Sequence, residues 1–344
     1  MNELVLKLNV IIFITTLVCL CMPYRQQINI FTGLCLITLG VLSWHTLVIY
    51  ILLSVIVYNL VKVNSLWAYQ IAIVLNILVF ILLQSLSKQN LMTTIGSIYL
   101  ICRQIHFIFE SYKCKLKNIT LWKLIRYQTF LPCVVAGPIH RVAEFETELN
   151  RRHFSWLTLS NGIELLIAGH FKVIVLGHII SLALLEPNQI KYTHSILEFL
   201  KLYIVFSGFT DIARGYGYML GIRLPPNFNN PLFSHNIQDF WQRWHMSLTQ
   251  WCQNYVFTPL YAKFRSFLIA SIITMVVIGL WHEFSFRYVL WGIYHGLGIA
   301  VFRYYRENLI FKMPRVLSTL LTLIFVISSY EITSFLNKKI LALL

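Results

Sequence analysis

The segment FWQRWHMSLTQW, residues 240–251, places Arg243 and His245 among three tryptophans in a chain that is otherwise rich in hydrocarbon side chains. His282 in GLWHE and His295 in WGIYHG follow, each after a short apolar run. An imidazole has an ordinary pKa of about 6.5, so it can accept or donate a proton near neutral pH. These histidines are therefore candidates for general acid or base chemistry in a membrane, although their spacing alone does not name the reaction.

The sequence motifs of several other catalytic mechanisms are absent. A zinc site needs three or four ligands at supporting spacing, and the chain contains neither HxxxH nor HExxH, so we expect no metal. The GxSxG turn and the phosphate-binding loop are absent as well. The remaining histidines are single residues typical of packed or hydrogen-bonded side chains: His45, His106, His140, His153, His170, His178, His194 and His235. The cysteines form no CxxC pair, which indicates packing residues: Cys19, Cys21, Cys35, Cys102, Cys114, Cys133 and Cys252.

The composition is that of an integral membrane protein. Of the 344 residues, 58% are hydrophobic and 12% are charged, and the mean hydropathy is +0.69. Apolar runs of about 20 residues recur, each long enough to cross a hydrocarbon core. We expect an all-α polytopic bundle of roughly eight to eleven transmembrane helices plus re-entrant or interfacial helices. The expected spans lie near 4–22, 28–61 (one long or two short), 67–87, 91–109, 160–186, 193–220, 266–282, 288–303 and 315–336.

The first span shows no cleavage pattern, so we interpret it as retained rather than as a signal peptide. The net charge of +15 lies mainly between spans, as in the cluster of Lys113, Lys115, Lys117, Lys123 and Arg126. Such charge favours contact with anionic lipid and a cytoplasmic position for residues 105–127. We expect no nucleic-acid partner. The expected location is the inner (cytoplasmic) membrane, crossed several times.

We treat 1–344 as one membrane domain, with scaffold spans in 1–90, a motif-bearing catalytic core in 91–300 and a C-terminal span in 301–344. Polar residues in apolar surroundings gather in four islands, 96–112, 130–146, 206–251 and 279–296. In the second island, FLPCVVAGPIHRVAEFE, Pro132, Gly137 and Pro138 interrupt a run too short to cross the bilayer. This pattern favours a re-entrant or interfacial segment over a plain loop.

The third island contains charged residues and a predicted amphipathic helix. Asp211 and Arg214 are three positions apart, and we favour a structural ion pair between them over direct chemistry. Asn236 is a predicted N-cap, with Asp239 three residues later as an acidic variant of the capping box. The helix that follows carries an apolar-aromatic stripe formed by Trp241, Trp244, Leu248 and Trp251. His245 lies at the edge of this stripe.

Several separate motifs together resemble the membrane-bound O-acyltransferase family. They are FSGFTDIARGYGYMLGIRLPPNFNNPLFSHNIQDFWQRWHMSLTQWCQNYVFTPL, the later GLWHEFSFRYVLWGIYHG, the earlier FLPCVVAGPIHR and, more weakly, GSIYLICRQIHFIFESY. They occur in the family's order between residues 91 and 300. Within the family, the resemblance is strongest to the bacterial branch that contains alginate O-acetyltransferase and the D-alanyl transferase of teichoic acids.

The resemblance implies helices around a central tunnel or funnel that donor and acceptor enter from opposite membrane faces. It implies transfer of an acyl group, expected to be acetyl, to a hydroxyl of an envelope polysaccharide or glycolipid. The family's essential LWH histidine matches His282, and its RWH histidine matches His245. We expect His282 to act as general base and His245 to orient a substrate or stabilise charge on the carbonyl oxygen. The expected substrate-binding residues are Trp241, Arg243, Trp244, Trp281 and Asn229.

No bound cofactor is expected beyond the donor substrate, an acyl thioester on coenzyme A or on an acyl-carrier protein. The expected partners are membrane lipid, the donor or carrier protein on the cytoplasmic side, the acceptor and, as a further candidate, an extracytoplasmic acyltransferase. One departure from the branch is Glu283, where glycine is common; its carboxylate either orients an imidazole or raises the pKa of that imidazole, or it faces water.

Three alternatives remain open. The first is transfer of D-alanine to teichoic acid. The second is a transporter or flippase, for which Asp211, Arg214 and the broken AGPI segment would be suitable. The aromatic RWH helix would be an unusual pore lining, and no inverted repeat is visible. The third is an inactive family member that serves only as an assembly partner.

Overall fold

The computed structural model describes residues 3–89, 94–113, 116, 120–134, 136–153, 155–186, 191–308 and 313–341, and its regular elements there are all helical. Within this part of the chain, four helical stretches are long and apolar enough to cross a membrane: Trp44–Lys62, Leu66–Lys88, Trp156–Ala183 and Arg315–Ile340. Shorter apolar helices are Lys7–Leu20, Gln27–Leu42 and Phe267–His282. The predicted all-α membrane class is confirmed. The number of crossings, roughly eight to eleven, stays a prediction.

The chain forms two compact units. Unit 1 comprises Met1–Leu176 and Val205–Pro225, and unit 2 comprises Gly177–Ile204 and Pro226–Leu344. Helix α10, Lys191–Met219, contributes residues to both units. The functional partition expected from the sequence, with boundaries at 90 and 300, stays a prediction.

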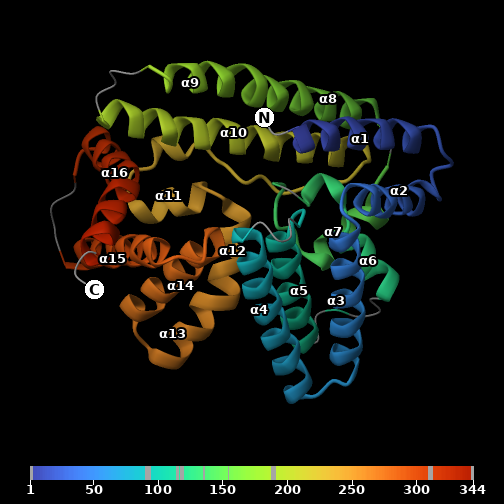
Figure 1. Cartoon of the computed structure of the whole chain (residues 1–344), viewed down its shortest axis with the longest axis horizontal. Helices are drawn as coiled ribbons and strands as arrows, with labels where there is room; N and C mark the ends of the chain where they lie inside the picture. Colours follow the sequence, from blue (N-terminus) through green and yellow to red (C-terminus); the bar gives the residue numbers. More distant parts are fainter. Residues whose placement is uncertain are drawn as a thin grey trace. The chain divides into compact units, whose positions relative to one another are not determined.

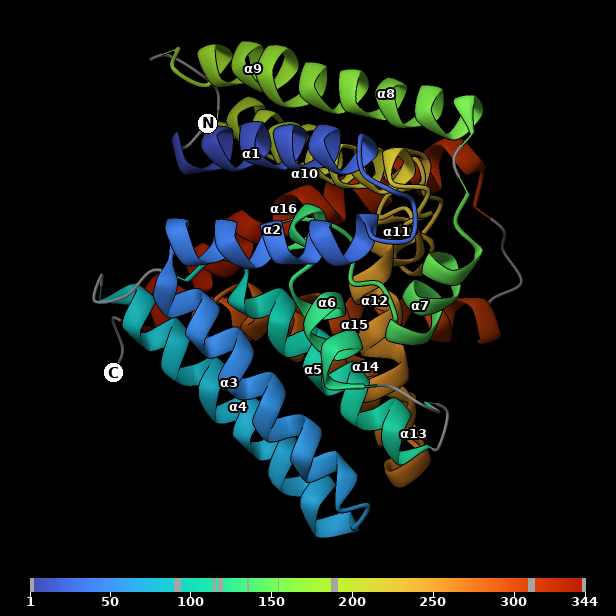
Figure 2. The same ribbon diagram turned by 90° about the vertical axis from the view of Figure 1, so that its right-hand side faces the viewer.

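Unit 1 holds the N-terminal helices, of which α3, α4 and α5 pack side by side (Figures 1 and 2). Its elements are α1 (Glu3–Leu20), α2 (Gln27–Leu42), α3 (Trp44–Lys62), α4 (Leu66–Lys88), α5 (Ser97–Tyr112), α6 (Leu121–Gln128), a 3-10 turn (Leu131–Cys133), α7 (Val142–Arg151), α8 (Trp156–His170), a π-helical segment (Phe171–Leu176) and the end of α10. The apolar stretch 28–61 is two helices, because the Ser43 hydroxyl accepts a hydrogen bond from the Thr46 N–H at 3.4 Å and caps α3.

A buried arginine supports the irregular second island. Arg103 of α5 is fully buried. Its Nη1 donates to the carbonyl oxygen of Gln128 at 3.0 Å, and its Nη2 donates to that of Cys133 at 2.5 Å. These carbonyls end α6 and the 3-10 turn, so one guanidinium satisfies backbone groups that the broken helix leaves without partners. The position of this segment relative to the bilayer stays a prediction.

The charged pair of the third island has a third member. Arg214 Nη1 lies 3.6 Å from Asp211 Oδ1, within ion-pair distance. Lys172, in the π-helical segment, approaches Asp211 Oδ2 more closely, at 2.6 Å. Sequence reasoning did not single out Lys172, because the two partners are separated by 39 positions.

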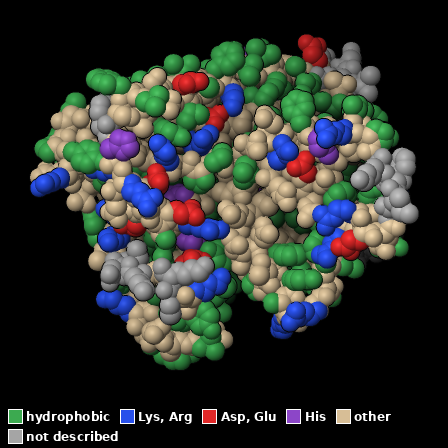
Figure 3. Space-filling model, turned by 180° about the vertical axis from the view of Figure 1, so that it is seen from behind, with side chains coloured by type: hydrophobic (Ala, Val, Ile, Leu, Met, Phe, Trp, Pro, Cys, Tyr) green, Lys and Arg blue, Asp and Glu red, His purple; other side chains and the backbone are tan. Residues whose placement is uncertain are grey.

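The basic cluster near residue 120 is only partly described: Lys115, Lys117 and the neighbouring Cys114 lie outside the described residues. Arg126 pairs with Glu146 at 2.6 Å. On the face drawn in Figure 3, lysine and arginine side chains are scattered among hydrophobic ones. The cytoplasmic position of residues 105–127 stays a prediction.

Unit 2 contains the RWH, LWH and YHG motifs. Its elements are α9 (Gly177–Ala183), the first part of α10, a 3-10 turn (Pro231–Phe233), α11 (Ile237–Arg243), α12 (Met246–Cys252), a π-helical segment (Gln253–Phe257), α13 (Thr258–Phe264), α14 (Phe267–His282), α15 (Phe286–Asn308) and α16 (Arg315–Leu341). Helices α14 and α15 lie side by side in Figure 1. A Cβ on Gly292 of α15 would lie 2.4 Å from the Cα of Val276, so glycine permits this close approach. The approach places Trp291 against α14.

Candidate active site

Helix α11 begins where the sequence predicts. The Asn236 side chain accepts a hydrogen bond from the backbone N–H of Asp239 at 2.8 Å, so the predicted N-cap is confirmed. The predicted capping-box variant is wrong. In a capping box the acidic side chain accepts from the N–H of the N-cap, here Asn236, but Asp239 accepts from the N–H of His235 at 3.0 Å. The same carboxylate also binds Arg243 Nε at 2.7 Å.

The prediction of one continuous amphipathic helix through residue 251 is wrong. Helix α11 ends at Arg243, α12 begins at Met246, and His245 between them is left-handed with φ 42° and ψ 53°. The left-handed backbone conformation costs a non-glycine residue roughly 1–2 kcal/mol, and such strain is often found at functional sites. The stripe that sequence spacing placed on one helix is therefore divided between two.

Asn227, in a loop earlier in the chain, stabilises this break between the two helices. The carbonyl oxygen of Asn227 accepts from the N–H of Met246 at 2.9 Å. The side-chain oxygen of Asn227 accepts from the N–H of Ser247 at 3.3 Å. These bonds satisfy N–H groups at the start of α12, which have no helical acceptor. Sequence reasoning missed Asn227; the asparagine-rich run NFNN between prolines was the available signal.

The two predicted catalytic imidazoles contact one indole. The ring of His245 lies edge-on to that of Trp281 with centroids 5.4 Å apart, and His282 lies edge-on to the same indole at 4.8 Å. His245 is 1% exposed, whereas His282, the last residue of α14, is exposed. His245 lies between helices, outside the membrane-spanning segments, and burial lowers its pKa well below the usual range. Its imidazole is therefore neutral at pH 7.

A second aromatic layer connects His282 to α11. Trp291 lies edge-on to His282, with centroids 5.9 Å apart, and edge-on to Trp241 at 5.7 Å. His295 packs against Trp291 at 4.5 Å and against Trp241 at 5.3 Å. Neither ring nitrogen of His295 forms a hydrogen bond with the residues that the structure describes. Trp291 was not predicted as a site residue, although it belongs to the WGIYHG motif.

The other predicted residues have different surroundings. Arg243 Nη1 donates to the carbonyl oxygen of Asn229 at 3.4 Å, and the Asn229 N–H donates to the carbonyl oxygen of Arg243 at 3.0 Å. Trp244 is buried and stacks on Phe240, with centroids 5.4 Å apart. Glu283 caps the end of α14 through its backbone and is exposed. Asp211 and Arg214 belong to unit 1.

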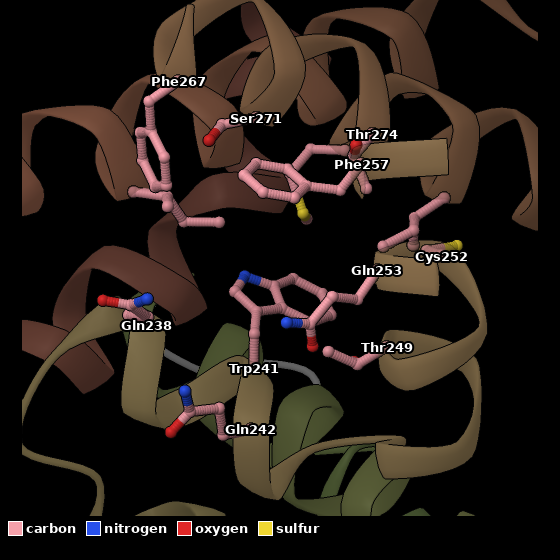
Figure 4. A pocket seen from close by; sticks show the side chains of 13 residues that line it. Gln238, Trp241, Gln242, Thr249, Cys252, Gln253, Phe257, Phe267, Ser271 and Thr274 are labelled. Carbon is pink, nitrogen blue, oxygen red and sulfur yellow. The ribbon is translucent and has the colours of Figure 1, made fainter. Parts of the chain in front are cut away.

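A pocket of about 150 Å³ borders the site between α11, α12, the π-helical segment and α14. The indole of Trp241 extends into it from α11, opposite Ser271 and Thr274 of α14 (Figure 4). Its exposed rim includes Gln242 and Gln253, and its deeper wall is buried.

Comparisons with known proteins agree on one family. The model of the MBOAT, membrane-bound O-acyltransferase family, matches residues 3–337. The peptidoglycan O-acetyltransferase of Helicobacter pylori is 30% identical over 217 residues, which are 58% of this chain and 41% of that protein. The teichoic acid D-alanyltransferase of Streptococcus thermophilus is 28% identical over 242 residues, 62% of this chain and 57% of that protein. The probable alginate O-acetylase AlgI of Pseudomonas aeruginosa is 29% identical over 248 residues, which are 67% of this chain and 46% of that protein. The chain spans about half the length of these curated relatives.

Proposed function

Because the chain belongs to the membrane-bound O-acyltransferase family, we propose that it transfers an acyl group, acetyl above all, to a hydroxyl of a cell-envelope polysaccharide or glycolipid. The donor is a thioester of coenzyme A or of an acyl-carrier protein. The observation that carries the proposal is the contact of His245 and His282 with the single indole of Trp281.

In the proposed step, His282 is the general base. Its exposed ring can meet a substrate, and a hydroxyl needs a base because it is a weak nucleophile. The imidazole takes the hydroxyl proton while the oxygen attacks the carbonyl carbon of the thioester. The tetrahedral intermediate then expels the thiolate, and the imidazolium returns the proton to sulfur. The products are an ester and a free thiol.

His245 assists as a hydrogen-bond donor in this proposal. A neutral imidazole carries one N–H, which can stabilise negative charge on the carbonyl oxygen. One such donor is worth about 2.7–4 kcal/mol in other enzymes. The left-handed backbone supports this role, because strained backbone conformations of this kind are often found at functional sites.

The proposed setting is the inner membrane, with the thioester supplied from the cytoplasmic side and the acceptor on the other side. An extracytoplasmic acyltransferase is a candidate partner that would pass the acyl group onward. Transfer of D-alanine is the second candidate, favoured by the similarity to the S. thermophilus D-alanyltransferase.

The test uses membranes that contain the full chain, labelled acyl thioesters and envelope polysaccharide from its own cells. We expect His282→Ala to lower the rate of ester formation by at least about a hundredfold. His194→Ala is the matched control, since the side chain of that histidine is 45% exposed and lies on α10. Transfer by His282→Ala at the wild-type rate would disprove the base assignment. A wild-type chain that moves labelled material without forming an ester would indicate a transporter.

A further inference from the structure

The pocket beside Trp241 lies on the same face of α14 as His282. Phe267, Ser271, Thr274 and Ile278 all line it, and they follow one another at intervals of three or four residues. His282 is the next residue in this series, four positions after Ile278. Side chains at this spacing share one helix face, and four residues correspond to a rise of about 6 Å. The series therefore leads from the pocket to the proposed base.

Two buried polar groups that line the pocket are able to form a hydrogen bond with a ligand. Trp241 Nε1 and Ser271 Oγ form no hydrogen bond within the described residues. Both side chains are more than nine-tenths buried, with 6% and 3% exposed. A buried indole N–H normally finds a partner, so an oxygen atom of a ligand is expected next to it.

The walls of the pocket carry no charged side chain among the described residues. Apolar contact comes from residues such as Phe257, Met275 and Ile278, and among the described residues that line the pocket none is acidic or basic. A buried ammonium without a carboxylate partner is costly, and aromatic rings offset only part of that cost. A volume of about 150 Å³ is the size of a cavity that accommodates benzene, which has six heavy atoms.

We infer that this pocket holds the acyl end of the donor and selects short, uncharged acyl groups, with an oxygen atom of the donor near Trp241 Nε1. The inference rests on the proposed acyl transfer and specifies its substrate. Acetyl and butyryl groups fit this volume. Octanoyl would extend past the pocket onto its exposed rim, and a D-alanyl group carries an ammonium for which the walls offer no counter-charge.

Size selection can be shifted in both directions. The assay uses acetyl-, butyryl-, octanoyl- and D-alanyl-pantetheine as donors and the polysaccharide acceptor described above. Ser271→Leu fills the pocket and should lower the butyryl-to-acetyl rate ratio by about tenfold or more. Met275→Ala enlarges it and should raise the octanoyl-to-acetyl ratio by a similar factor. Ile273→Ala is the matched control, because this residue lies on the exposed side of the same helix.

The outcomes separate this inference from the proposed function. Unchanged ratios in both pocket variants, with transfer retained, would overturn the acyl pocket and leave the transferase intact. Wild-type transfer of D-alanyl as fast as acetyl would also overturn it. If the wild type transfers none of the donors, the proposed function and the inference fail together. If Ser271→Leu does not fold, Met275→Ala and the wild-type preference still decide.

Discussion

The carbonyl oxygen of Asn227 accepts a hydrogen bond from the N–H of Met246 at 2.9 Å, directly after the left-handed residue between α11 and α12. The side chain of the same asparagine binds the next N–H, that of Ser247. A loop residue thus serves as the cap of α12, and its contact holds the proposed site histidine His245 in a strained backbone conformation.

Asn227→Ala should lower the free energy of unfolding by about 1–2 kcal/mol, because the buried Ser247 N–H loses its acceptor. The measurement is chemical unfolding of the full chain in detergent micelles. Asn229→Ala is the control, since Asn229 is exposed and uses only backbone atoms to bind Arg243. Equal effects of the two substitutions would show that the cap has no special importance.

Alanine at two helical glycines should have effects of opposite sign. Gly292→Ala should lower the free energy of unfolding by about 1–3 kcal/mol, because its Cβ would lie 2.4 Å from the Cα of Val276. Gly33→Ala in α2 should raise it by about 0.5–1 kcal/mol, since nothing lies within 4 Å of the added carbon. Thermal unfolding in the same detergent compares both variants, and stabilisation by Gly292→Ala would contradict the close approach of α14 and α15.

Removing the guanidinium of Arg103 should destabilise unit 1 strongly. Arg103→Met leaves the carbonyl oxygens of Gln128 and Cys133 buried without their donor, at a cost of roughly 1–3 kcal/mol for each. The control is Arg25→Met, at an exposed position. Size-exclusion profiles before and after heating report the loss of folded protein. A variant as heat-resistant as the control would mean that other groups satisfy these carbonyls.

The Lys172–Asp211 pair should show strong coupling in a double-mutant cycle. Asp211→Asn should cost more than Lys172→Met, because it leaves two cations, Lys172 and Arg214, without their counter-charge. We expect a coupling of about 1–3 kcal/mol between the two substitutions. The comparison is the Arg303–Glu307 pair, at 2.7 Å, whose carboxylate is 49% exposed against 15% for Asp211; it should couple by less than about 1 kcal/mol. Additive single effects at Lys172 and Asp211 would argue against a tight pair.

Local sequence signals predicted the helical membrane class and the start of α11. Asn236 begins α11 because its side chain caps a neighbouring N–H, and such a contact depends on adjacent residues alone. Ser43 divides the apolar stretch 28–61 by a cap of the same kind, although the sequence alone leaves open whether this stretch is one long span or two short ones. Apolar run length likewise identified the span 160–186, which the structure contains as the stretch Trp156–Ala183.

Interactions between distant residues account for what sequence reasoning missed. The break at His245 contains neither proline nor glycine, and Asn227, about twenty positions earlier, caps the second helix. Lys172 forms an ion pair with Asp211, which lies on another helix. Trp291 reaches the proposed site because glycine allows α14 and α15 to approach closely. No pattern within one helix contains these relationships, because they depend on tertiary packing.

The π-helical segment Gln253–Phe257 constrains how this region can change in length. A π-helical turn holds one residue more than an α-helical turn, so deleting a single residue would convert it to regular helix. Each residue advances an α-helix by about 100°, but here the lost residue would be offset by the tighter α-helical turn, so the side chains of α13 would keep their directions. Both Gln253 and Phe257 border the pocket, so any change in side-chain direction would be confined to this part of its wall. A deletion of one residue in this segment should therefore be tolerated better than a deletion inside α13, where no extra residue compensates for the rotation.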